Sequence, residues 1–183
     1  RYAGDVKTLG QPDMVMIPGS KNTMSDLKWM RQNGMEAAIL KLAAANVPVL
    51  GICGGYQMLG ESIEDPDGEE GGGSLHGMGL LPVRTVFGKE KVQTRVTGEI
   101  LQNPGAGDGL FAALCGSVFS GYEIHMGHTT GNGKNSFSRI RTLTNGSTEA
   151  EEDWQADGAV CGNVAGTYVH GLFENGSLTK NLC

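Results

Sequence analysis

Residues 47–60, VPVLGICGGYQMLG, join an apolar β-type run to a helix-like run through a cysteine surrounded by glycines. Residues 47–50 are typical of a buried strand, and residues 56–59 are typical of the start of a helix. Between them lies Gly51-Ile52-Cys53-Gly54-Gly55, a G-x-C-x-G sequence. This is the cysteine version of the strand–turn–helix segment known as the nucleophile elbow. The order therefore predicts that Cys53 is a nucleophile held above a sheet.

The residues around Cys53 suit that chemistry. Small neighbours keep the backbone from clashing at a sharp turn, and the N-terminus of the following helix is expected to favour thiolate over thiol. The backbone N–H of Gly54 would then donate to an oxyanion. The alternative is a buried structural cysteine in a glycine-rich turn, and the flanking strand and helix favour the nucleophile.

Length and charge exclude several classes of protein. A chain of 183 residues is one ordinary domain that can bury a full core without disulfides. Its net charge is −6 and it has no basic stripe, so neither nucleic acid nor a membrane surface is an expected partner. Its longest apolar runs are far too short to span a membrane.

The four cysteines, at positions 53, 115, 161 and 183, are widely spaced and include no C-x-x-C pair. This spacing argues against a zinc ribbon or a disulfide framework and predicts a reducing, cytoplasmic location. We interpret Cys115, Cys161 and Cys183 as ordinary small residues.

Short apolar strands alternate with helices in the first third of the chain. Strands are predicted at 13–17 and 47–50, and helices at 24–45, with an interruption near Gly34, and at 55–62. This order predicts an α/β domain with a mostly parallel central sheet.

The remainder is glycine-rich and β-rich. Residues 63–77 are acidic and predict a mobile surface loop. We expect mostly antiparallel strands after it, some extending the main sheet and some forming a flap beside the site. They fall at 80–87, 91–100, 118–128 and 136–143, and two short strands, VCGN and GTYVH, follow within 159–170.

His170 is the candidate base for Cys53. It ends a strand-like run late in the chain and precedes Gly171, where an elbow-type hydrolase places its imidazole. The alternative is a surface histidine at a strand end.

Strand alternation in GYEIHMG (121–127) sends Tyr122, Ile124 and Met126 to one face, and Glu123 and His125 to the other. Two ligands are too few for zinc, so no metal site is predicted. A polar pair near the active site, or a structural His–Glu contact, is the expected role.

Pro18-Gly19-Ser20 follows the first strand and could present backbone N–H groups at the sheet edge, completing an oxyanion hole with Gly54. The alternative is a plain connection in which Ser20 or Asn22 caps the next helix. The chain has no phosphate-binding G-x-x-x-x-G-K-[ST] sequence, and no G-x-G-x-x-G follows a strand, so no nucleotide cofactor is predicted for it.

Four motifs together resemble the glutamine amidotransferase domains (class I) of the cobyric acid synthase type. They are PGSKNT (18–23), GICGGYQMLG (51–60), GYEIHMG (121–127) and GTYVHGLFEN (166–175). The resemblance covers the whole chain in the family's order. It implies a three-layer, flavodoxin-like α/β domain over 1–183 with an added antiparallel β segment, excised from a longer chain with an N-terminal ATP-dependent synthetase domain.

The resemblance implies that Cys53 attacks the side-chain amide of glutamine to form a thioester, with His170 as base. It also implies Gly19, Ser20, Gly54, Gln57 and Glu123 as oxyanion or substrate-binding residues. Ammonia would pass to the synthetase domain, which binds ATP and Mg²⁺ and amidates adenosylcobyrinic a,c-diamide in cobalamin biosynthesis. The expected partners are thus glutamine and that domain.

The chain departs from many class I glutamine amidotransferases in one respect, which the subgroup that it resembles generally shares. They place a glutamate two residues after the histidine, where this chain has Leu172. A Cys–His dyad is one interpretation, and Glu174 is a possible third catalytic group. The alternatives are the glutaminase subunit of a lipid II-amidating enzyme or of a cobyrinic acid a,c-diamide synthase, a non-catalytic binding relative, and a cysteine peptidase.

Overall fold

The computed structural model describes residues 1–183 apart from 103–106, 108, 132–134, 144–153, 175–177 and 181–183. The described helices are α1 (Val6–Leu9), α2 (Thr23–Gln32), α3 (Met35–Ala44), α4 (Gly54–Leu59) and α5 (Leu110–Ala113). The strands are β1 (Val15–Ile17), β2 (Val49–Ile52), β3 (Ser62–Asp65), β4 (Gly73–His76), β5 (Val83–Ile100), β6 (Val118–Gly131), β7 (Ser138–Thr142), β8 (Gln155–Asp157), β9 (Ala159–Cys161), β10 (Val164–Thr167) and β11 (Val169–His170).

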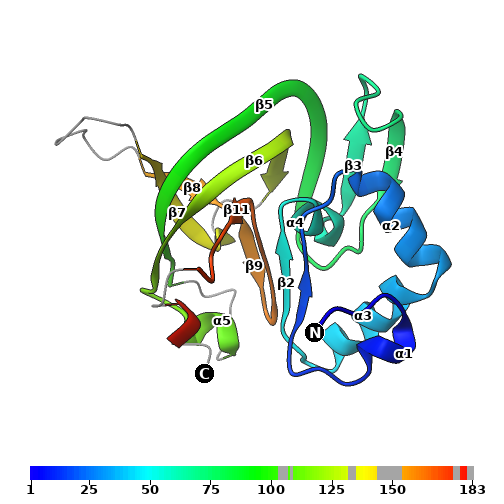
Figure 1. Cartoon of the computed structure of the whole chain (residues 1–183), viewed down its shortest axis with the longest axis horizontal. Helices are drawn as coiled ribbons and strands as arrows, with labels where there is room; N and C mark the ends of the chain where they lie inside the picture. Colours follow the sequence, from blue (N-terminus) through cyan, green and yellow to red (C-terminus); the bar gives the residue numbers. More distant parts are fainter. Residues whose placement is uncertain (103–106, 108, 132–134, 144–153, 175–177, 181–183) are drawn as a thin grey trace.

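The elements form three layers (Figure 1). Helices α2 and α3 lie on one side of a first sheet, whose strand order is β1-β2-β10-β9. The long strands β5 and β6 lie on its other side and belong to a second sheet, ordered β11-β6-β5-β3-β4 with β7 and β8 attached. This confirms the predicted α/β fold with an added antiparallel segment.

The first sheet is mostly parallel, as predicted. Strands β1 and β10 both pair with β2 in parallel, and only β9 runs antiparallel, at the edge. Val49 and Leu50 of β2 point to opposite faces. Val49 packs into a core with α2 and α3, while Leu50 packs into a second core with Val96 and Phe119 of the second sheet. Because both faces are covered, the strand reads as a continuous apolar run.

Helices α2 and α3 meet at Gly34, which has a left-handed backbone (φ 74°). This confirms the interruption predicted there, because glycine adopts that conformation without a steric cost. Asn22 caps α2 by accepting the N–H of Ser25 (2.9 Å).

The second sheet differs from the prediction in two ways. The predicted strands at 80–87 and 91–100 are one strand, β5, whose pairing with β6 shifts register between Val86 and Lys91. In the described parts, none of the four β-rich runs pairs with the first sheet, so the prediction that some extend it is wrong. The inward-pointing side chains of these strands instead pack against the face of the first sheet that does not carry α2 and α3.

The prediction of a mobile loop at 63–77 is also wrong. Strands β3 and β4 form an antiparallel hairpin there. The buried carboxylate of Asp65 accepts the N–H groups of Glu69 (2.9 Å), Glu70 (2.7 Å) and Gly72 (2.8 Å). One side chain thus satisfies three backbone donors that an acidic, glycine-rich turn would otherwise leave to water.

The GTYVH run is divided between the sheets. Val164–Thr167 pairs with β2, whereas Val169–His170 pairs with β6. The Thr167 hydroxyl accepts the N–H of Val169 (3.0 Å), which turns the chain out of the first sheet.

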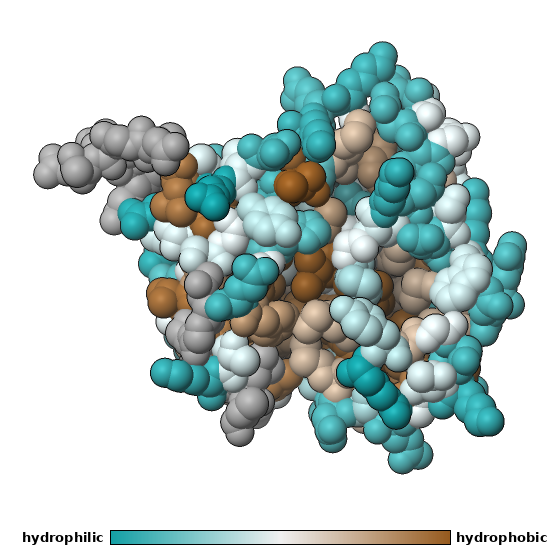
Figure 2. All heavy atoms as spheres, in the orientation of Figure 1, coloured by the Kyte–Doolittle hydropathy of each residue, from teal (hydrophilic) through white to brown (hydrophobic). Residues whose placement is uncertain are grey.

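Figure 2 shows apolar residues along the middle of one face, where the layers meet, and hydrophilic residues around the periphery. Among the described residues, no helix is long and apolar enough to cross a membrane. Cys53, Cys115 and Cys161 are free thiols, while Cys183 lies outside the described residues.

Gly55 should tolerate no side chain, because α4 lies against the end of β1. A Cβ at position 55 would be 2.1 Å from the Ile17 carbonyl oxygen, so backbone must move. We expect Gly55→Ala to lower the free energy of unfolding by about 1–3 kcal/mol or more, measured by urea denaturation with tryptophan fluorescence. Gly88→Ala, which meets nothing within 4 Å, is the matched control. Equal stability of the two variants would contradict the close packing at Gly55.

Candidate active site

Cys53 lies between β2 and α4 in a strained backbone conformation. Its φ of 53° and ψ of −111° are unusual for a residue with a side chain. Hydrogen bonds on both sides hold it there: its N–H donates to the Thr167 carbonyl oxygen (2.8 Å), and its own carbonyl accepts the Gln57 N–H (3.0 Å). Strain of this kind persists only where the surroundings determine it, and it concentrates at functional sites. The predicted elbow is therefore present.

The glycines around Cys53 are required by close approach of backbone. A Cβ at Gly51 would lie 2.6 Å from the Gly55 carbonyl oxygen, across the turn. A Cβ at Gly54 would lie 2.9 Å from the Ser20 backbone nitrogen. The two predicted oxyanion segments, Gly54 and the Gly19–Ser20 turn, are therefore adjacent in space.

His170 lies at the end of β11, with its imidazole stacked on Tyr122 of β6. The ring centroids are 5.3 Å apart and the planes differ by 6°. A Cβ added to Gly19 would be 2.9 Å from His170 Cε1 and 3.6 Å from Cys53 Cβ, so both side chains lie against the space that a side chain at position 19 would fill. The Nε2 atom of His170 is buried and makes no hydrogen bond to the residues that the structure describes.

Cys53 and His170 line one open cavity of about 390 Å³. Its lining residues are Gly19, Ser20, Lys21, Cys53, Tyr122, Ile124 and His170. Sequence reasoning singled out four of these as site residues and missed Lys21, Tyr122 and Ile124. The predicted alternation of β6 could have identified Tyr122 and Ile124, because it placed both on the face opposite Glu123.

Burial disfavours the charged forms of both Cys53 and His170. It raises the pKa of the Cys53 thiol; the Gly54 N–H opposes this, and the Glu70 carboxylate adds to it. Burial and the nearby His125 lower the pKa of His170 below 6.5. The expectation that the helix would favour thiolate is wrong, because the pKa of the thiol is raised. Helix α4 has only six residues, and its dipole does not compensate the lost hydration of a buried anion.

The Ser20 side chain is engaged away from the cysteine. Its hydroxyl donates to the Asp26 carboxylate and accepts the Asn22 N–H (3.0 Å). Ser20 therefore lines the cavity with its backbone turn, while Asn22 caps α2.

Gln57 lies behind the cavity and links three elements. Its amide donates to the Met126 carbonyl (3.1 Å) and the Tyr168 hydroxyl (3.2 Å), and its oxygen accepts from the Thr23 hydroxyl (3.1 Å). The residue is 2% exposed. In this structure it joins α2, β6 and the end of β10, and it does not line the cavity.

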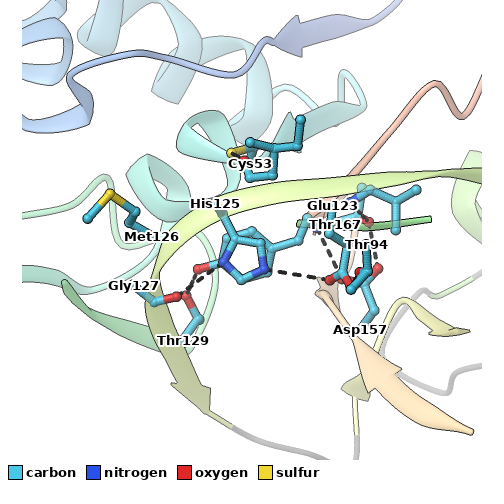
Figure 3. A network of polar contacts seen from close by, with 12 residues as sticks. Cys53, Thr94, Glu123, His125, Met126, Gly127, Thr129, Asp157 and Thr167 are labelled. Atoms are coloured by element: carbon cyan, nitrogen blue, oxygen red, sulfur yellow. Dashed lines mark hydrogen bonds and ion pairs between the residues drawn. The ribbon is translucent and has the colours of Figure 1, made fainter. Parts of the chain in front are cut away.

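Glu123 and His125 form a polar pair on the far face of β6 (Figure 3). A Glu123 oxygen lies 3.6 Å from His125 Nε2, and the other accepts from the Thr94 hydroxyl (3.2 Å). His125 stacks on Tyr168 at 3.8 Å between ring centroids. This confirms the predicted His–Glu contact. The pair lines a second cavity of about 450 Å³, which does not include Cys53 or His170.

Glu174 is exposed, and its backbone N–H donates to the Gly171 carbonyl (3.0 Å). Its carboxylate lies beside Gly171, and the described contacts include no hydrogen bond from it to His170.

In the described part of the chain, no three His, Cys, Asp or Glu side chains are grouped to hold a metal ion.

Comparison with known proteins gives one consistent family. The CobB/CobQ-like glutamine amidotransferase domain matches residues 1–178. Similar curated proteins are the cobyric acid synthases of Ruminiclostridium cellulolyticum (50% identity over 183 residues), Lachnoclostridium phytofermentans (43% over 185) and Yersinia enterocolitica (45% over 186). Each alignment covers 100% of this chain and 34–35% of the relative. The chain thus spans about a third of the length of these relatives.

Two solved structures share the fold. A glutamine amidotransferase aligns with a TM-score of 0.56 and 16% identity, over 100% of this chain and 83% of that one. PurLQS from Thermotoga maritima aligns with a TM-score of 0.51 and 18% identity, over 82% and 67%. At this identity the likeness concerns the fold alone.

The raised pKa of Cys53 predicts slow reaction with a generic alkylating reagent. We expect iodoacetamide to modify Cys53 more slowly than exposed Cys115 at pH 7, because less thiolate is present. The rate should still increase with pH at pH 9, the ordinary thiol pKa. Peptide mass spectrometry resolves the two sites. A Cys53 rate that levels off below pH 8 would show a lowered pKa instead.

Proposed function

The chain belongs to the CobB/CobQ-like glutamine amidotransferase domain family, and from this premise we propose that Cys53 and His170 hydrolyse glutamine to release ammonia. The observation that supports this most is their placement in one cavity, where both side chains lie beside Gly19. A strained cysteine and an adjacent imidazole are the parts that covalent catalysis needs.

Acylation begins with two neutral groups. Cys53 Sγ attacks the side-chain amide carbon of glutamine while its proton passes to His170, giving a tetrahedral adduct and an imidazolium. The imidazolium then protonates the leaving nitrogen, the C–N bond breaks, and ammonia departs from a γ-glutamyl thioester. In the second half, His170 takes a proton from water, hydroxide attacks the thioester, and glutamate leaves as the thiol reforms.

The oxyanion of both tetrahedral adducts needs fixed donors. Gly54 N–H is directed at the sulfur side of the turn, since it lowers the pKa of the Cys53 thiol. The Ser20 nitrogen lies against Gly54. We assign the oxyanion hole to these two backbone segments, Gly54 and Gly19–Ser20. Lys21 is the one cationic side chain among the cavity-lining residues, and we assign it the α-carboxylate of glutamine.

The ammonia acceptor belongs to the longer protein. The similar relatives are named cobyric acid synthase, and none of those cited is named a lipid II-amidating enzyme or a cobyrinic acid a,c-diamide synthase. We therefore propose that this chain supplies ammonia to an ATP- and Mg²⁺-dependent synthetase region of the same polypeptide, located in the cytoplasm. That region would amidate the peripheral carboxylates of adenosylcobyrinic a,c-diamide.

Cys53→Ser should abolish glutamine-dependent amidation in a protein that joins this chain to the synthetase region. A neutral hydroxyl is a far weaker nucleophile than a thiolate, whereas added ammonia bypasses Cys53 and should support amidation at the original rate. Cys161→Ser, at an exposed cysteine, is the matched control and should retain both activities. Glutamine-dependent product from Cys53→Ser would remove Cys53 as the nucleophile.

His170→Ala should lower glutamine hydrolysis by about 10²–10⁴-fold, the usual effect of losing a general base. Because the pKa of His170 lies below 6.5, the wild-type rate should fall with acid at a midpoint below that value, and the variant should lose this dependence. Released glutamate is measured against pH, with His76→Ala, at an exposed histidine, as control. A normal rate from His170→Ala would exclude it as the base.

A further inference from the structure

Asp157 is a buried carboxylate that the proposed mechanism does not use. It ends β8 and is 4% exposed. One oxygen accepts the hydroxyls of Ser138 (2.7 Å) and Thr167 (2.5 Å), and the other accepts the Tyr168 N–H (3.1 Å). Burial raises its pKa, and these donors oppose that shift. Figure 3 shows Asp157 and Thr167 beside the Glu123–His125 pair.

Thr167 connects this carboxylate to both catalytic residues. Its carbonyl oxygen accepts the N–H of Cys53, the residue whose backbone is strained. Its hydroxyl accepts the N–H of Val169, directly before His170, and is thereby oriented to donate its own proton to Asp157. The hydroxyl and the carbonyl of Thr167 therefore hold the segment that carries His170 against the segment that carries Cys53.

A carboxylate is a costly way to hold a turn. Removing it from water opposes folding, and a neutral acceptor would satisfy the same hydroxyl and amide donors at lower cost. A carboxylate gains over a neutral group by making stronger, shorter hydrogen bonds. Asp157 makes such bonds to Thr167 and Tyr168, in the segment whose carbonyl holds Cys53 and which leads directly into His170. Glu123 lines the same second cavity as Asp157, but its described contacts are with Thr94 and His125, and Glu174 is exposed.

We propose that Asp157 is a positioning residue that sets the placement of Cys53 relative to His170 through the Thr167 hydroxyl. The proposal rests on the glutaminase function assigned to Cys53 and His170. It differs from a triad, because the carboxylate acts on the backbone that carries the imidazole and not on the imidazole itself.

The test measures trapping of Cys53 by a chloroketone analogue of glutamine in the full chain. The thiolate attacks the chloromethyl carbon, a C–S bond forms, chloride leaves, and the thiol proton passes to His170. The rate constant at saturation reports alignment of Cys53 and His170, the half-saturating concentration reports binding of the glutamine moiety, and the final labelled fraction reports folded protein. Wild-type trapping, with protection by glutamine, tests the glutaminase function itself.

Thr167→Val removes the hydroxyl and keeps the shape of the side chain, and Thr167→Ser restores the hydroxyl. We expect the saturating rate to fall about 10–100-fold in Thr167→Val and in Asp157→Asn, with an unchanged half-saturating concentration and full final labelling. Thr167→Ser should recover most of the rate. Ser138→Ala, which loses a bond to the same carboxylate from β7, is the matched control and should react within about threefold of wild type.

Each outcome tests either the glutaminase function or the positioning role of Asp157. If wild type is not trapped, or glutamine does not protect it, the glutaminase function fails and the inference fails with it. If wild type is trapped and Thr167→Val reacts equally fast, Asp157 has no positioning role while the glutaminase function stands. If the variants lose only final labelling, with an unchanged rate constant, Asp157 acts on stability alone and the proposal is overturned.

Discussion

The structure depends on the close approach of backbone around Cys53. The elbow fits only because Gly55 lies against the Ile17 carbonyl and Gly166 of β10 lies against the Tyr56 ring, where a Cβ would be 2.1 Å from the nearest atom in each case. These contacts lock α4 onto the ends of β1 and β10. The strained φ and ψ of Cys53 follow, because the chain must pass from β2 into α4 within that space.

The close backbone contacts around Cys53 also explain why the chain changes sheet after Thr167. Strand β10 must end where the elbow begins, since its last carbonyl accepts the Cys53 N–H. The chain then enters the second sheet at Val169, and β6 supplies Tyr122 under the His170 ring. The nucleophile thus comes from the mostly parallel first sheet and the base from the mostly antiparallel second sheet. The site forms only where the two sheets meet, and for that reason a small displacement between the layers would separate the pair.

Local patterns predicted the parts of this arrangement that local chemistry determines. The elbow, the break at Gly34 and the alternation of β6 each depend on neighbours within a few residues, and all are present. The β3–β4 hairpin was missed because it is held by hydrogen bonds from three backbone N–H groups to the Asp65 carboxylate. An acidic, glycine-rich composition gives no sign of such bonds. Asp157 was missed because it ends a three-residue strand, too short for any periodicity, and its partners come from β7 and β10. Glu174 drew attention by its nearness to His170 in sequence, yet it is exposed.

The neutral resting state of Cys53 and His170 follows from the same burial that builds the site. Proton transfer from thiol to imidazole creates two charges, and the burial of each group opposes its charged form, since it raises the pKa of the Cys53 thiol and lowers the pKa of His170. Attack on an amide changes this balance, because the negative charge leaves the sulfur for an oxygen that backbone N–H groups can hold. The imidazolium then lies near a stabilised oxyanion, and it passes its proton to the leaving nitrogen as the tetrahedral adduct collapses. Separation of charge is therefore favourable only with an acyl donor in place, which restricts reaction of the thiol to the substrate the cavity admits.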